Sequence, residues 1–438
     1  LGRINGFQIW TNTAIANMRK GIAAVIVQPK VLMERTLPQY QELIARDATK
    51  SIFYQPIKNF PADFSQADKT RLTAAYVKAI QTQINPTYQK LYDFVKNEYL
   101  PKCRATSGLY TVPNGKERYA FLVKYYTTTN LTPEEIHQIG LSEVARIKGE
   151  MEKVKTQTNF KGDLKAFFNY IRTDDKFSPH QTPEDVLNAY RSIESRLQAN
   201  VPKYFGITPK SKFEIRQTEK FRESSASEEY SSPAPDGSRP GIFYVPIPDA
   251  TQYGSPDMES TFLHEAIPGH HFQISLQQEN DALPKFRKYL WYNAYGEGWA
   301  LYTESLGKEL GIYTDPYQYF GMLTNEMHRA IRLVVDTGIH SKGWTREEAI
   351  KYSLENEGAS EENITREIER YMAIPAQALS YKIGQLKIIE MRRKAEKSLG
   401  TKFDIRAFHD ETLKDGVLPL DVYEAKMNAW ISRQQTAK

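Results

Sequence analysis

The chain has 438 residues, of which 40% are hydrophobic and 25% are charged, as is typical of a globular protein rather than a disordered one. Its net charge of +5 is small and its basic residues are dispersed, so we expect no nucleic-acid partner. The longest apolar run, residues 21–27, is too short to span a membrane. The single cysteine excludes an internal disulfide and a cysteine-rich zinc site.

The first residue is Leu1 rather than methionine, and the sequence shows no signal-peptide pattern. We therefore expect a mature, trimmed or truncated form of a longer protein. The low cysteine content is compatible with an exported bacterial protein.

Helical periodicity dominates the chain. Residues 72–99 predict one or two helices that are interrupted near Pro86. Thr132, followed by proline and two glutamates, predicts the start of a helix that runs to about residue 155. Thr182 repeats this start signal, and Thr345 begins a run that resembles a capping box.

Residues 206–250 are the exception to the helical pattern. Residues 212–221 alternate like a half-buried strand, and the polar stretch 223–240 predicts a surface loop. Residues 241–247 then form a short apolar strand, in which Pro246 favours an edge position.

These patterns predict a mainly α fold with one small antiparallel β insert. The sequence contains no internal repeat and no clear linker. We expect an N-terminal helical lobe over residues 1–130. A second helical domain over residues 131–438 would carry the insert and the candidate catalytic residues.

Three of the eight histidines lie within eight residues, at His264, His270 and His271. Imidazoles this close to a carboxylate, here Glu265, commonly form a divalent metal site. The pair His264–Glu265 resembles the start of a zinc-hydrolase signature. The usual His-Glu-x-x-His pattern nevertheless fails, because position 268 is proline.

On a straight helix, neither later histidine could share a zinc ion with His264. A spacing of six residues turns the two rings apart, and a spacing of seven separates them by about 10 Å. A local bulge at Pro268 and Gly269 that absorbs two residues would bring His270 to the position of a ligand one turn away. We therefore favour His270 as the ligand, and expect His271 behind the ligands or beside the substrate.

Glu297, in the run 293–304, is the best candidate for a third ligand. Glu304 follows two helical turns later on the same face, where it either hydrogen-bonds a ligand histidine or is solvated. The two glycines that flank Glu297 suggest a close approach to another backbone. The sequence thus predicts one zinc ion per chain, held by His264, His270 and Glu297.

Arg332, Asp336 and His340 are spaced so that they line one face of a helix, with Asp336 able to orient both neighbours. An oriented imidazole near a metal can stabilise a developing oxyanion, although a surface row of salt bridges would show the same spacing. Pro375 should break a helix, and Tyr381 lies on the segment that follows. A tyrosine hydroxyl could assist at the metal, or Tyr381 could simply pack.

Four motifs resemble the bacterial domain-of-unknown-function 885 family. They are His-Glu-Ala-Ile-Pro-Gly-His-His at 264–271, Gly-Glu-Gly-Trp-Ala-Leu-Tyr at 296–302, Arg-Leu-Val-Val-Asp-Thr-Gly-Ile-His at 332–340 and Tyr-Met-Ala-Ile-Pro-Ala-Gln-Ala-Leu-Ser-Tyr-Lys-Ile-Gly at 371–384. The chain departs from the family pattern at Ala376, where we expect glycine.

That family is similar to the helical zinc oligopeptidases, which are gluzincin-like metallopeptidases. The resemblance implies a mostly α fold split by a deep cleft, and it aligns the Gly-His of their signature with Gly269 and His270. Their second glutamate, seven residues after the ligand glutamate, matches Glu304. The resemblance also implies an exported, periplasmic or cell-envelope protein, with a lipid anchor on a missing N-terminal segment.

The leading hypothesis is a zinc metallopeptidase in which Glu265 is the general base, and His340 and Tyr381 stabilise the oxyanion. The strand at 241–247 would pair with an extended peptide substrate. Two alternatives remain. One is a metal-dependent hydrolase of a non-peptide amide or ester, and the other is a catalytically degenerate binding protein. The sequence leaves endo- and exopeptidase activity open.

Overall fold

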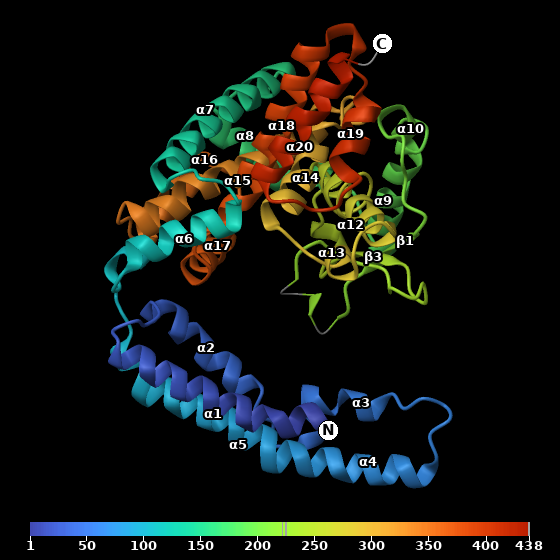
Figure 1. Ribbon diagram of the computed structural model, residues 1–438. Coiled ribbons are helices and arrows are strands. Elements are labelled where there is room, and N and C mark those ends of the chain that lie inside the picture. Colours follow the sequence, from blue (N-terminus) through green and yellow to red (C-terminus); the bar gives the residue numbers. More distant parts are fainter. Residues whose placement is uncertain (221, 224–225, 437–438) are drawn as a thin grey trace. The chain divides into compact units, whose positions relative to one another are not determined.

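The computed structural model describes residues 1–220, 222–223 and 226–436, and the chain divides into two compact units, Leu1–Lys116 and Glu117–Lys438. In the described residues the fold is mainly helical with one small sheet, which confirms the expected fold class (Figure 1). No described helix is long and apolar enough to cross a membrane.

The first unit is helical. Its α-helices are α1 (Gly2–Ala23), α2 (Lys30–Glu42), α3 (Gln55–Lys58), α4 (Gln66–Ala79) and α5 (Asn85–Phe94). Its core consists of buried apolar side chains, namely Ile15, Val27, Met33, Leu91, Phe94, Val95 and Tyr99. Pro86 does not break the helical path, because it lies in the first turn of α5, where its missing N–H costs no hydrogen bond. A π-helical segment, Ile80–Ile84, joins α4 to α5 instead.

The second unit contains the remaining helices and the sheet. Its first α-helices are α6 (Gly115–Thr127, which begins at the end of the first unit), α7 (Pro133–Gln157), α8 (Leu164–Thr173), α9 (Pro183–Leu197) and α10 (Val201–Tyr204). After the sheet come α11 (Met258–Glu265), α12 (His270–Glu279), α13 (Lys285–Lys288), α14 (Asn293–Ser305), α15 (Pro316–Ser341) and α16 (Arg346–Asn356). The last are α17 (Glu361–Ala373), α18 (Ser380–Leu399), α19 (Ile405–Leu413) and α20 (Leu420–Thr436).

Capping boxes set the starts of three of these helices, α7, α9 and α16. Thr132, Thr182 and Thr345 each accept a hydrogen bond from the backbone N–H three residues later, and each completes a capping box. These three predicted starts are confirmed. Two helix pairs, α7 with α15 and α14 with α18, form the main packing contacts of the unit.

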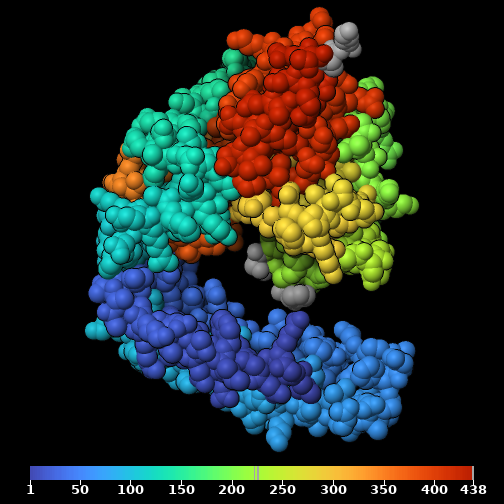
Figure 2. Space-filling model, in the orientation of Figure 1, coloured from blue at the N-terminus to red at the C-terminus, as the bar shows by residue number. Residues whose placement is uncertain are grey.

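The surface of the second unit in Figure 2 is formed largely by its last helices. The segment that contains α13 lies beside them at the surface, because Arg287 donates hydrogen bonds to the carbonyls of Asp415 and Val417. The predicted break at Pro375 is confirmed, since α17 ends at Ala373 and α18 begins at Ser380.

The sheet has three strands in the order β1 (Phe213–Gln217), β3 (Gly241–Val245), β2 (Glu229–Ser231). Strands β1 and β3 are parallel, and only β2 and β3 are antiparallel, so the expectation of a purely antiparallel insert was wrong. Strand β2 lies within the stretch 223–240 that we expected to be a loop; residues 224–225 of it are outside the described residues, as is Phe221.

Strand β3 lies in the centre of the sheet rather than at an edge, so the predicted edge position was wrong. Pro246 does not interrupt the ladder, because it follows the last paired residue, Val245. Both sides of β3 are occupied by neighbouring strands, and it therefore cannot accept a substrate strand.

Candidate metal centre

The chain between α11 and α12 is a sharp break, not the bulge that we expected. Helix α11 ends at Glu265 and α12 begins at His270, with Ala266 and Gly269 in non-helical conformations. A Cβ atom at Gly269 would lie 1.9 Å from the carbonyl oxygen of His264, so only glycine allows α12 to start this close to α11. The break brings His270 back beside His264.

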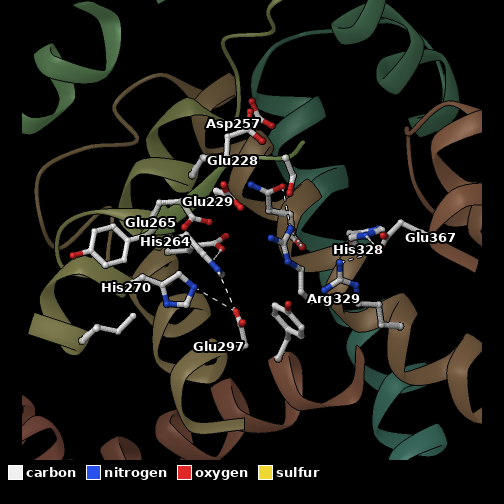
Figure 3. Close-up of a pocket in the computed structure, with 18 of the residues that line it drawn as sticks. Glu228, Glu229, Asp257, His264, Glu265, His270, Glu297, His328, Arg329 and Glu367 are labelled. Atoms are coloured by element: carbon white, nitrogen blue, oxygen red, sulfur yellow. Dashed lines mark hydrogen bonds and ion pairs between the residues drawn. The ribbon is translucent and has the colours of Figure 1, made fainter. Parts of the chain in front are cut away.

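The side chains of His264, His270 and Glu297 converge on one point (Figure 3). The two imidazole rings lie 4.8 Å apart and are perpendicular. Glu297 Oε2 lies 3.6 Å from His264 Nε2 and 3.5 Å from His270 Nε2. Ligand atoms at tetrahedral zinc, each bonded at 2.0–2.1 Å, lie about 3.4 Å apart. These separations therefore fit a single zinc ion.

Glycines on both sides of Glu297 allow α14 to pack tightly. A Cβ atom at Gly298 would lie 2.5 Å from the backbone of Gly384 in α18, and a Cβ atom at Gly296 would overlap the ring of Trp291. The first contact is the close backbone approach that the sequence suggested. It brings α18, which carries Tyr381, against the helix that carries Glu297.

Glu304 lies behind His264, and it is only 1% exposed. Its Oε1 lies 2.7 Å from His264 Nδ1, which fixes the ring and leaves Nε2 facing Glu297. Burial would lower the pKa of His264, but contacts with Glu297 and Glu304 outweigh it and raise that pKa to about 9. Burial would raise the pKa of Glu297, yet the two histidines hold it below its ordinary value.

Glu265 provides a second carboxylate beside the imidazoles. One atom from each of His264, Glu265 and His270 lies within 4.8 Å of the others. Glu297 Oε2 lies within the same limit of both histidines, so two carboxylates, Glu265 and Glu297, flank the imidazole pair. Burial raises the pKa of Glu265 above its ordinary value, and the histidines offset part of the shift.

His271 points away from this group. Its Nδ1 lies 2.9 Å from the hydroxyl of Tyr230, and its ring packs against the tilted ring of Phe213, with the ring centres 4.6 Å apart. It lines a separate cavity of about 450 Å³, and burial lowers its pKa to about 4. Of the two adjacent histidines, the structure thus brings only His270 to His264 and Glu297.

The candidate ligands lie in a cavity of about 610 Å³. Arg332 and Tyr381 are among the described residues that line it, whereas Asp336 and His340 are not. The row from Arg332 to His340 spans about 12 Å of helical rise, so only one end of it reaches the cavity. The other end enters the core, where Asp336 and His340 are both fully buried.

Asp336 and His340 contact other elements of the second unit. The hydroxyl of Tyr119 donates a 2.6 Å hydrogen bond to Asp336, and the backbone N–H of Ala376 donates to the same carboxylate at 3.1 Å. His340 Nε2 lies 3.0 Å from the carbonyl oxygen of Tyr371. Burial raises the pKa of Asp336 to about 7.

Sequence reasoning missed several residues that line the cavity, among them Glu228, Asp257, Asn325, His328, Arg329 and Glu367. The signal for three of them was present on α15, because Asn325, His328 and Arg329 continue the face of Arg332 toward the N-terminus. Glu228 carried no such signal, since it lies in the polar stretch that precedes β2.

The fold and the site define a mainly helical protein with a buried cluster of histidines and glutamates suited to a divalent metal. The chain belongs to the family described as "Bacterial protein of unknown function (DUF885)", which matches residues 1–427. No curated protein matches the chain.

Two solved structures are similar to the whole chain. One, a "putative lipoprotein" from Colwellia psychrerythraea, is 33% identical with a TM-score of 0.93, over 98% of this chain and 75% of that one. Another, a "putative lipoprotein of unknown function" from Shewanella oneidensis, is 22% identical with a TM-score of 0.71, over 97% and 77% of the two chains, and shows the fold alone. The description of the first of these structures as a lipoprotein is consistent with a cell-envelope location.

Proposed function

We propose that this protein is a zinc-dependent metallopeptidase. The observation that carries the proposal is the convergence of His264, His270 and Glu297 at separations of 3.5 and 3.6 Å, with Glu265 beside them in the same cavity. Two imidazoles and one carboxylate are the protein ligands of many catalytic zinc sites, which keep a further position open. The likeness of the motifs to helical zinc oligopeptidases supports the same function.

Zinc, when bound by these three side chains, supplies Lewis acidity that polarises a carbonyl group and makes water easier to deprotonate. Glu304 holds the ring of His264 in one orientation through the contact at Nδ1. Trp299 donates a 2.9 Å hydrogen bond to the carbonyl of Pro268, which ties the break between α11 and α12 to α14. These two contacts hold His264 and the break before His270 in fixed positions relative to α14, which carries Glu297.

Glu265 is the general base in this proposal. Its carboxylate lies beside the ligand histidines, and its raised pKa suits a group that takes a proton from water and later delivers it to the leaving amine. Tyr381, which lines the cavity, would donate a hydrogen bond to the oxyanion that develops on the scissile carbonyl. The mechanism does not use His340, since that side chain is buried away from the cavity.

An extended peptide would pair with β2 rather than with the segment 241–247. Strand β2 is at the edge of the sheet, and two of its residues, Glu229 and Tyr230, line the cavity. Edge strands bind extended peptides through backbone hydrogen bonds. We also propose an exported, cell-envelope protein with a lipid anchor, because the 33% identical structure is described as a lipoprotein.

Metal analysis of matched histidine variants tests the proposal. We expect about one zinc per chain in the purified protein, and the loss of zinc and of peptide hydrolysis in His270→Ala. His271→Ala is the matched control, because it removes a neighbouring buried imidazole that contacts Tyr230 instead. It should keep its zinc.

Equal loss of zinc in both variants, with folding intact by circular dichroism, would count against the assigned ligands. Full zinc occupancy without hydrolysis of any peptide would instead favour a non-peptide amide or ester substrate. Panels of peptide, amide and ester substrates separate these outcomes.

A further inference from the structure

Two arginines on α15 face the candidate metal centre across the cavity. Arg329 and His328 lie opposite His270 and Glu265 (Figure 3), and Arg332 lines the same cavity one turn later. The opposite side of the cavity carries the histidine and glutamate side chains that are proposed to hold zinc, whereas this side carries guanidinium groups. Binding of a metal ion does not explain guanidinium groups in the same cavity, whereas binding of a negatively charged part of the substrate would.

Arg329 has few partners for a partly buried guanidinium. Its Nη1 makes only long contacts with Asn325, at 3.2 Å to the carbonyl oxygen and 3.3 Å to the side chain. Its Nε is buried and has no hydrogen-bond partner. Among the described residues, no carboxylate forms an ion pair with it.

Two nitrogens of the Arg332 guanidinium have hydrogen-bond partners, and the third has none. Arg332 is 8% exposed, its Nε donates to the hydroxyl of Tyr371 at 3.0 Å, and its Nη2 contacts Glu367 at 3.0 Å. Its Nη1 is buried without a partner. Glu367 also binds Arg370 at 2.9 Å, so a single carboxylate is shared between two guanidinium groups. The guanidinium groups on this side of the cavity therefore carry more positive charge than Glu367 neutralises.

Unpartnered buried donors are rare, because such a group loses its bonds to water and gains none in return. Here two of them lie on neighbouring residues of one helix, in a cavity next to candidate catalytic groups. The planar fork of a guanidinium matches the two oxygens of a carboxylate. Two further acidic residues among those described in the cavity, Glu228 and Asp257, lie at its upper side in Figure 3, and neither forms an ion pair with Arg329 or Arg332, although the charge of Arg329 does act on the carboxyl of Asp257.

We propose that Arg329 and Arg332 bind a carboxylate of the peptide substrate, either its free C-terminus or an acidic side chain close to the scissile bond. This inference rests on the proposed peptidase function. Tyr381 links the two sites, because the guanidinium of Arg332 lies 4.6 Å over its ring and Tyr381 lines the cavity with Glu297. An extended peptide advances about 3.3–3.6 Å per residue, so the carboxylate lies within a few residues of the cleaved bond.

Binding of three peptides to the Glu265→Gln protein tests this inference without turnover. The peptides share an acetylated N-terminus and neutral side chains. One ends in a free carboxylate, the second in an amide, and the third in an amide after a C-terminal glutamate. Calorimetry would measure each dissociation constant with Arg329 intact and with Arg329→Gln added.

We expect at least one carboxylate peptide to bind more tightly than the neutral amide, and to lose about 30-fold or more in affinity when Arg329→Gln removes its partner. The neutral amide should change little. Arg191→Gln is the matched control, since Arg191 is an exposed arginine of α9 that does not line the cavity. Arg329 is preferred to Arg332 for substitution, because Arg332 also supports the fold through Tyr371 and Glu367.

A preference for the free C-terminus would make the protein a carboxypeptidase, and a preference for the glutamate side chain would make it selective for acidic residues. Both results support a carboxylate site. Equal affinity for all three peptides, with the same small effect of Arg329→Gln on each, would overturn it. If zinc binding or hydrolysis fails, the proposed function falls, while an Arg329-dependent carboxylate preference would still be measurable.

Discussion

Two opposite walls of the cavity are stabilised by different kinds of contact. The imidazole wall consists of His264, Glu265, His270 and Glu297 on α11, α12 and α14, and the arginine wall consists of His328, Arg329, Arg332 and Glu367 on α15 and α17. Behind the imidazole wall, aromatic rings pack closely, with Trp299 and His409 5.8 Å apart and both fully buried. Behind the arginine wall lie ion pairs, among them Lys382 with Glu326 at 2.6 Å.

This difference separates two ways of positioning a polar side chain. Close packing supports the imidazole wall through shape, and the contact of Glu304 with His264 fixes the orientation of one ring. The arginine wall is stabilised by ion pairs, because removing one partner of a buried pair leaves the other charge unpaired and lowers the free energy of unfolding. Substitution of Glu265 in the first wall should therefore affect chemistry, whereas substitution of Glu367 in the second should affect stability.

The largest expected effect comes from Glu265→Gln in the imidazole wall. Loss of the general base should lower kcat for peptide hydrolysis by about 10²–10⁴-fold, while zinc content stays near one per chain. Glu184→Gln is a control outside the cavity, and it should keep its activity because Glu184 is an exposed residue of α9 that pairs with Arg191. Loss of zinc in Glu265→Gln would mean that Glu265 is a ligand instead.

Glu367→Gln should have the next largest effect, and on stability rather than on chemistry. The substitution leaves Arg332 and Arg370 without their shared carboxylate, which costs about 3 kcal/mol in the free energy of unfolding. Urea denaturation measures this difference. Glu362→Gln, in the exposed first turn of the same helix, should cost under about 1 kcal/mol. Equal effects of both would remove the contrast between the walls.

The sequence indicated that His270 returns to His264 because this information is local. The spacing of His264 and His270 around Pro268 and Gly269 identified which histidine returns to the first, even though the chain breaks rather than bulges there. The glycines beside Glu297 also indicated the close approach of another helix. These signals depend only on covalent geometry within a few residues.

The arginine wall and the sheet could not be predicted in the same way. Periodicity places Arg332, Asp336 and His340 on one face, but it does not tell which end of that face meets the cavity and which enters the core. The order of the strands depends on pairings between segments far apart in the chain, so β3 was assigned to an edge that β2 and β1 occupy. Tertiary packing decides both.

His409 should make the base of the imidazole wall sensitive to acid. Burial lowers its pKa to about 3, below the ordinary value of 6.5, so the unfolded state binds more protons between these two pH values. Its contribution to stability is complete above pH 6.5 and falls by about 1.4 kcal/mol per pH unit below it. His409→Gln should flatten this dependence, measured by urea unfolding at pH 7 and pH 5. An unchanged difference between the two pH values would contradict the assignment.

The smallest expected effect lies beneath the arginine wall, at Ala376, which has a φ of +68° at a position where the family resemblance leads us to expect glycine. Ala376→Gly relieves a left-handed conformation worth about 1–2 kcal/mol, but it removes a buried methyl group and adds chain entropy to the unfolded state. These contributions nearly cancel, so the free energy of unfolding should change by less than about 1 kcal/mol. Ala378→Gly, two residues away and equally buried, has no such strain to relieve and should lose about 1–2 kcal/mol. Equal losses of unfolding free energy in the two variants would show that the backbone at Ala376 carries no strain. The hydrogen bond from its N–H to Asp336 would then hold the segment between α17 and α18 at no conformational cost.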